Sequence, residues 1–134
     1  MMTEYRKQRC IAIAKTLFYK KTGKNFHVSF ILDKNKLLVT GVNSYVDLHL
    51  SHRFGIYKPQ KNLPQDQKSR YVAGRHSEIV AINTYINIYG DSDCSGLTLF
   101  NVRLDNDGLT RIAKPCNNCL PIIEACGFKK IIWT

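Results

Sequence analysis

The residues best suited to chemistry are a Cys-x-x-Cys pair and a His-x-Glu motif that precedes it. The pair is Cys116 and Cys119 in KPCNNCLPII, and the motif is His76 and Glu78 in RHSEIVAI. Two cysteines three residues apart share one face of a helix, and a helix N-terminus lowers the pKa of a thiol toward the thiolate that binds zinc. Considered alone, the pair is compatible with a redox disulfide, half of a structural zinc site, a catalytic metal site or no site at all.

A metal ion needs at least a third ligand, and His76 is the best candidate because it opens a strongly patterned helix. Residues i and i+2 point roughly 200° apart on a helix, so His76 and Glu78 would normally lie on different sides. A metal placed over the abutting N-termini of two helices can nevertheless be reached by both residues and by both cysteines. The redox alternative is the weakest because no thioredoxin pattern accompanies the pair. Two further histidines lack a third ligand at suitable spacing, so we expect no second metal there: His49 and His52.

His-x-Glu followed by Pro-Cys-x-x-Cys is the signature of the zinc-dependent deaminases. On RHSEIVAI, KPCNNC and VTGVN (residues 39–43) the chain resembles the cytidine deaminase superfamily, which includes deoxycytidylate deaminases, tRNA adenosine deaminases and the APOBEC enzymes. The likeness covers roughly residues 26–133 in element order. It implies one zinc ion per chain bound by His76, Cys116 and Cys119, a proton shuttle at Glu78, and contact between Asn43 and the sugar or base. Asn43 is the final residue of VTGVN, a stretch that is similar to the family's G-x-N motif.

The chain departs from the family pattern near both motifs. Ser77 stands where many members carry alanine, and we expect this small residue to adjoin the substrate. Lys114 precedes Pro115 where adenosine-type enzymes usually carry glutamate, which favours cytosine as the base. We therefore expect a hydrolase that converts cytosine to uracil on a free nucleotide or nucleoside. The alternatives are the same reaction on single-stranded DNA or RNA, and an inactive nucleic-acid-binding module that keeps zinc for stability.

The composition predicts a single domain over residues 1–134, because 134 residues that are 44% hydrophobic can bury one core without disulfides. Five cysteines are an odd number without framework spacing, which indicates buried thiols or metal ligands in a reducing compartment. The longest apolar run near the N-terminus, IAIAKTLFY, is too short to span a bilayer. We expect a cytoplasmic protein with no membrane partner.

The net charge of +10 is concentrated in the first part of the chain. Residues 1–75 hold 15 Lys or Arg against 4 acids, or +11, whereas residues 76–134 hold 5 against 6, or −1. A field of this sign favours a phosphate-bearing partner, either a mononucleotide or a nucleic acid, although a solvated basic surface is the alternative.

The segment from residue 44 to residue 74 interleaves aromatic and cationic side chains and is too long for a plain connection. We expect it to fold over a small substrate as a lid whose cations contact the phosphate, and the candidates are Arg53, Lys58 and Arg70. A platform for a nucleic-acid strand, or a packed loop with a solvated rim, would have the same composition.

Hydrophobic periodicity predicts helices over residues 3–23, 76–90 and 115–128, and strands over 26–32, 37–43, 97–104 and 129–134. A hairpin around the DNDG turn interrupts the last part of this series. The order predicts an α/β domain of three layers, α/β/α, with a mixed sheet of about four strands plus a β-hairpin extension, as in the cytidine deaminase-like fold. An uncovered edge beside the last strand leads us to expect a homo-oligomer.

Overall fold

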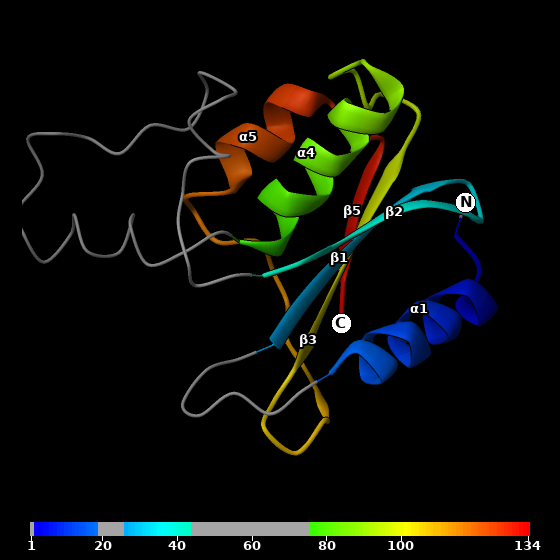
Figure 1. Ribbon diagram of the computed structural model, residues 1–134, viewed down its shortest axis with the longest axis vertical. Coiled ribbons are helices and arrows are strands. Elements are labelled where there is room, and N and C mark those ends of the chain that lie inside the picture. The colour runs from blue at the N-terminus through cyan, green and yellow to red at the C-terminus, as the bar shows by residue number, and fades with distance from the viewer. Residues whose placement is uncertain (1, 19–25, 44–75) are drawn as a thin grey trace, which may run out of the picture.

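The computed structural model of the chain describes residues 2–18, 26–43 and 76–134. Within these ranges it forms three helices and five strands around one sheet (Figure 1). The helices are α1 (Glu4–Leu17), α4 (Ser77–Tyr89) and α5 (Leu120–Cys126), and the strands are β1 (Phe26–Asp33), β2 (Lys36–Val42), β3 (Thr98–Leu104), β4 (Thr110–Arg111) and β5 (Lys130–Trp133). None of these three helices is long and apolar enough to cross a bilayer.

The sheet has the order β2-β1-β3-β4, and β5 pairs with β3 on the same side as β4. Every pairing is antiparallel except that of β3 with β5, which is parallel. β1 and β2 form the expected hairpin, and β3 and β4 form the second one, around the turn that begins at Asp105. The α/β class predicted from the sequence is confirmed.

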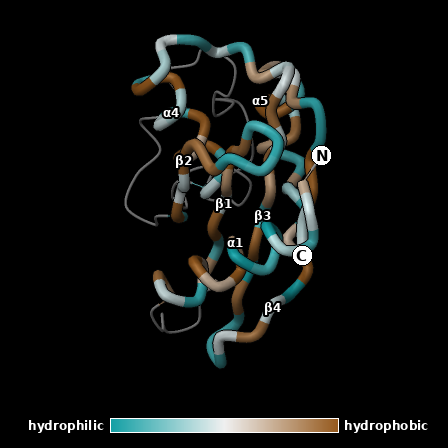
Figure 2. The backbone as a smooth tube through the Cα atoms, turned by 90° about the vertical axis from the view of Figure 1, so that its right-hand side faces the viewer, coloured by the Kyte–Doolittle hydropathy of each residue, from teal (hydrophilic) through white to brown (hydrophobic). Residues whose placement is uncertain are grey.

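The sheet buries apolar residues on both faces, which produces three layers (Figures 1 and 2). Helix α1 packs on one face, where Cys10 and Ala14 lie against Phe26, Phe30 and other residues of β1 and β3. Helices α4 and α5 cover the opposite face through a second cluster of buried aliphatic residues. Leu17, the last residue of α1, is 42% exposed, because the helix ends there and the backbone at the next residue is extended.

Two helices match the predicted pattern to different degrees. Helix α4 begins directly after His76, its N-cap, and ends at Gly90 in the left-handed conformation, as the sequence predicted. The third helix was predicted from residue 115, but α5 begins only at Leu120. The reason is Pro121, which has no N–H to donate to the carbonyl of Asn117, so the chain before it forms a turn rather than a regular helix.

Candidate metal centre and its surroundings

His76, Cys116 and Cys119 lie together, as predicted, at the N-terminal ends of α4 and α5. The Nδ1 atom of His76 lies 3.4 Å from the Sγ atom of Cys116 and 3.1 Å from that of Cys119. One ligand atom from each residue lies within 4.8 Å of the other two. Ligand atoms of a tetrahedral zinc site, with bonds of about 2.0–2.3 Å, are roughly 3.5 Å apart. The group could therefore hold a metal ion of that size.

Local structure explains why residues 40 positions apart meet here. His76 caps the N-terminus of α4, and Cys119 immediately precedes α5. The turn that carries both cysteines is closed by a hydrogen bond from the backbone N–H of Cys119 to the carbonyl of Cys116, at 3.1 Å. Because α4 and α5 share one buried cluster, packing on the same face fixes the distance between their N-terminal ends.

The electrostatics of the group favour a thiolate. A hydrogen bond from Cys119, and further interactions with His76, lower the pKa of Cys116 to about 4 against the opposing effect of burial. The pKa of Cys119 is raised, because it donates that hydrogen bond and is itself desolvated. The pKa of His76 is raised mainly by its hydrogen bond to Cys116. One negative sulfur is thus available in the group at neutral pH, and thiolates are the sulfur ligands that zinc requires.

Glu78 follows His76 by two residues and is not a member of the group that could hold a metal ion. Its side chain is buried, with only 6% of the residue exposed, and burial raises the pKa of its carboxyl. The charges of His76 and Cys116 both act on it, so it lies within electrostatic reach of the cluster. The hydroxyl of Ser77 donates a hydrogen bond of 3.1 Å to Glu78 Oε1.

A chain of buried polar atoms continues from Glu78 into the sheet. The Oγ atom of Ser77 lies 2.7 Å from that of Ser29 on β1, and the Ser29 hydroxyl donates to Asn101 Oδ1 on β3, at 2.7 Å. The amide nitrogen of Asn101 donates to the carbonyl of Ala113 at 3.4 Å, which makes its oxygen the atom that faces Ser29.

This chain joins four oxygen atoms by three contacts, but its two serines supply only two hydrogens. With Glu78 ionised, Ser77 donates to Glu78 and Ser29 donates to Asn101, so no hydrogen is left for the contact between the two hydroxyls. A proton on Glu78 supplies the missing hydrogen. The surroundings of Glu78 therefore favour a carboxyl that accepts a proton.

A glycine of β2 allows α4 to sit so close to the sheet. A Cβ atom on Gly41 would lie 2.4 Å from the backbone nitrogen of Ala81 and 2.6 Å from the carbonyl oxygen of Ser77. Asn43, two residues later, is 93% buried, and its Oδ1 atom accepts a hydrogen bond of 3.0 Å from the backbone N–H of His27. Asn43 thus holds the ends of β1 and β2 together, and its contact with a substrate stays a prediction.

The predicted contacts with the phosphate fall on residues that the structure does not describe. Arg53, Lys58 and Arg70 are outside the described residues, as are His49 and His52, so the lid and the second metal stay untested. Ser77 was predicted to adjoin the substrate, and the structure shows that its hydroxyl contacts Glu78 and Ser29, which makes its contacts those of a positioning residue.

The sequence did not single out Arg103, which lies near the cluster together with His27. His27 on β1 stands directly opposite Arg103 on β3. Burial, then the positive charges of Arg103 and His76, lower the pKa of His27 to about 4, so its imidazole is neutral at pH 7. The sequence signal for this polar face was the alternation of residues along each strand. Polar residues two positions apart in a buried strand share a face of the sheet.

No protein-family model matches the chain, and no curated protein is similar to it at a significant level. The geometry of the site is therefore the ground on which a function can be proposed.

Proposed function

We propose that this chain is a zinc-dependent hydrolytic deaminase, of a cytidine deaminase-like fold, that converts a cytosine base to uracil and ammonia. The observation that carries the proposal is the placement of Glu78, buried beside a His-Cys-Cys group and outside it. A structural site requires only ligands. A buried carboxyl next to those ligands costs stability, and such groups are typical of sites that transfer protons.

The ligand set supports zinc as the metal. Two sulfurs and one imidazole nitrogen are donors that zinc shares with few other biological ions. Among the described residues the group has three members, and three protein ligands are typical of catalytic zinc sites, whereas structural sites usually have four. Zinc held there would supply Lewis-acid chemistry, which lowers the pKa of a water molecule enough for attack at neutral pH.

Glu78 provides the proton transfers that the reaction needs. Its carboxylate accepts a proton from the attacking water and passes it to N3 of the cytosine ring. It then takes the second proton, from the hydroxyl group now on C4, and delivers it to the departing amino group, which leaves as ammonia. The hydrogen-bond chain through Ser77 and Ser29 suits this role, because it lacks one hydrogen until Glu78 is protonated. Cytosine and water are consumed, and uracil and ammonia are formed.

A free nucleotide or nucleoside is the substrate that we favour, and a homo-oligomer in the cytoplasm is the expected form of the enzyme. The same reaction on single-stranded DNA or RNA is the second candidate. The excess of +11 in residues 1–75 favours it, since a strand presents many phosphates to such a surface. An inactive module that uses zinc only for stability is the least supported reading, because it leaves the buried Glu78 without a role.

Ammonia release from cytidine, deoxycytidylate, adenosine, guanine and a single-stranded oligonucleotide tests the proposal. Zinc-loaded protein should release ammonia from a cytosine compound. The Glu78→Gln variant keeps the size of the side chain, so it should bind zinc and melt like the wild type while turnover falls by about 10² or more. Zinc-loaded protein that deaminates no cytosine compound, or a Glu78→Gln variant within tenfold of wild type, would contradict the proposal.

A further inference from the structure

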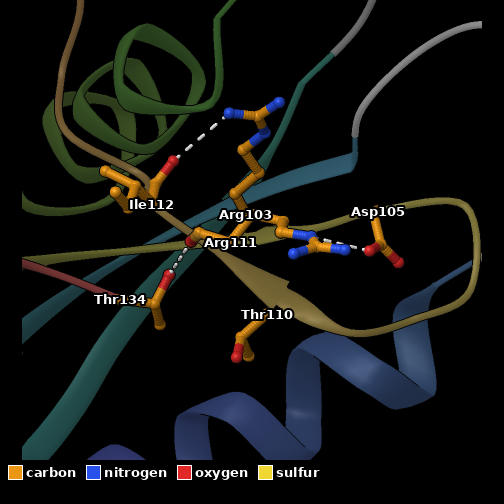
Figure 3. A pocket seen from close by; sticks show the side chains of 6 residues that line it. All are labelled: Arg103, Asp105, Thr110, Arg111, Ile112 and Thr134. Atoms are coloured by element: carbon orange, nitrogen blue, oxygen red, sulfur yellow. Dashed lines mark hydrogen bonds and ion pairs between the residues drawn. The ribbon is translucent and has the colours of Figure 1, made fainter.

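A pocket of about 560 Å³ opens where β3 meets β4 (Figure 3). Its lining is rich in hydrogen-bond donors and consists of Arg103, Asp105, Thr110, Arg111, Ile112 and Thr134. Two of these side chains are guanidinium groups, and a single one is an acid. The pocket therefore carries a net positive charge.

Register places Arg103 on the face of the sheet that holds the His-Cys-Cys group, whereas Thr110 stands opposite Leu104, which faces α1, so the pocket lies at the edge of the sheet. Asn101 contacts Ser29, and the hydroxyl of Ser29 touches Ser77 at the start of α4. Side chains two residues apart in a strand share a face, so Arg103 and His27 face the same side as Asn101 and Ser29. His27 stands directly opposite Arg103 in the β1–β3 ladder.

Arg103 is poorly satisfied by the protein. Its guanidinium has five N–H donors. One of them reaches the carbonyl of Ile112 at 3.4 Å, and the buried Nε atom has no hydrogen-bond partner among the described residues. Arg111 differs, because its Nε atom lies 2.8 Å from Asp105 Oδ2. In the described part of the chain no carboxylate lies within 4.0 Å of Arg103.

The two arginines also stand directly opposite each other in the β3–β4 ladder. Like charges at directly opposed positions destabilise a sheet, and a buried charged donor without a partner costs further free energy. Asp105 offsets the charge of Arg111, but no carboxylate of the described residues does so for Arg103. An anion with several oxygen acceptors would satisfy the free donors of Arg103 and offset the repulsion.

We propose that Arg103, assisted by Arg111, binds a phosphate group of the substrate in this pocket. The inference rests on the proposed function for the identity of the substrate, a cytosine nucleotide, and adds the site that recognises its phosphate. The guanidinium of Arg103 offers the planar pair of donors that binds a phosphate through two hydrogen bonds. The phosphate belongs either to a mononucleotide or to a nucleic-acid strand, and the experiment separates these sources.

The first measurement uses inorganic phosphate and the full chain labelled with ¹⁵N. Phosphate should shift the side-chain Nε–H resonance of Arg103, whereas sodium chloride at the same ionic strength should not. The Nε–H resonance of Arg6 is the internal control, because that nitrogen is also buried without a partner but belongs to α1 on the opposite face. An Nε–H resonance of Arg103 that does not shift when phosphate is added would overturn the proposal. This measurement needs no variant.

The second measurement compares Arg103→Met with Arg6→Met, which removes the same charge at the control position. Arg103→Met should raise KM for cytidine 5′-monophosphate on the order of 10- to 100-fold, the range expected for a charge-assisted hydrogen bond, and leave KM for cytidine unchanged. A loss seen with a single-stranded oligonucleotide but not with the monophosphate would identify a strand phosphodiester instead. Equal effects on cytidine and on the phosphorylated substrates, or no effect, would overturn the site.

Failure of the site and failure of the proposed function give different results. If Arg103→Met deaminates both cytidine and its monophosphate with the KM values of the wild type, the deaminase function is supported and the phosphate site is contradicted. If phosphate shifts the Nε–H resonance of Arg103 but the protein releases no ammonia, the phosphate site is supported and the deaminase function is contradicted.

Discussion

Replacing Gly41 by alanine should displace the helix that carries the candidate catalytic residues. The new Cβ atom would lie 2.4 Å from the Ala81 nitrogen, 2.6 Å from the Ser77 carbonyl oxygen and 2.8 Å from the Ala81 Cα atom. All three are backbone atoms of α4, so no side-chain rotation can relieve the contact. Ordinary contact begins at 3.4 Å, and α4 must therefore move by about 1 Å away from β2.

The displacement has two measurable consequences. Overpacking of a core costs about 1–3 kcal/mol, which lowers Tm by roughly 3–15 °C for a domain of this size. Metal sites tolerate changes of about 0.2 Å in ligand position, so a shift of α4 by about 1 Å should separate His76 from the cysteine turn before α5. Zinc affinity should fall together with stability.

Thermal melting of metal-free protein and competition for zinc against a chelating dye measure the two effects separately. Gly96→Ala is the matched control, because a Cβ atom there meets nothing within 4 Å. The control should match wild type in both assays. A Gly41→Ala protein that melts with wild type and binds zinc with unchanged affinity would refute the inferred contact between β2 and α4.

Three further predictions follow from the electrostatics of the site. In metal-free protein Cys116, whose pKa is about 4, should react with iodoacetamide at pH 6, and zinc should protect it; mass mapping of the alkylated residue checks this. Ser77→Ala should keep zinc and KM but lower kcat by about tenfold, because Glu78 loses its hydrogen-bond partner, and an unchanged kcat would exclude a positioning role. His27 has a pKa of about 4 in the folded protein, so the unfolded chain binds the proton more readily, and the free energy of unfolding should fall by up to about 3 kcal/mol between pH 6.5 and pH 4. In His27→Gln, urea unfolding should show a smaller dependence of this free energy on pH over the same range.

Local sequence patterns were sufficient for those parts of the site that depend on helix ends. A histidine before a stretch of helically spaced apolar residues and a glycine after it define α4. Cys116 and Cys119 are three residues apart, so a single turn brings them together. The late start of α5 could also be inferred, since Pro121 removes a helical donor. Such features are predictable because their causes lie within a few residues.

Features that depend on the pairing of strands could not be inferred in the same way. Arg103 meets His27 and Arg111 only because β3 lies between β1 and β4 in one particular register. A shift of one residue would turn each of these side chains to the other face of the sheet. The close approach at Gly41 likewise requires the position of α4 over β2, which no spacing along the sequence specifies.

The face of the sheet below α4 and α5 changes in character along the strands, and this change bears on what it binds. Ile31 and Leu99 pair within the apolar cluster, Ser29 and Asn101 pair next, and then His27 pairs with Arg103. The polar pairs lie toward the N-terminus of α4, where the helix dipole is positive. The positive end of the α4 dipole does not stabilise the guanidinium of Arg103. Both positive groups therefore favour an anion that comes from outside the chain. On the proposed function, a cytosine nucleotide would supply this anion, because it would present its base to the His-Cys-Cys group and its phosphate to Arg103.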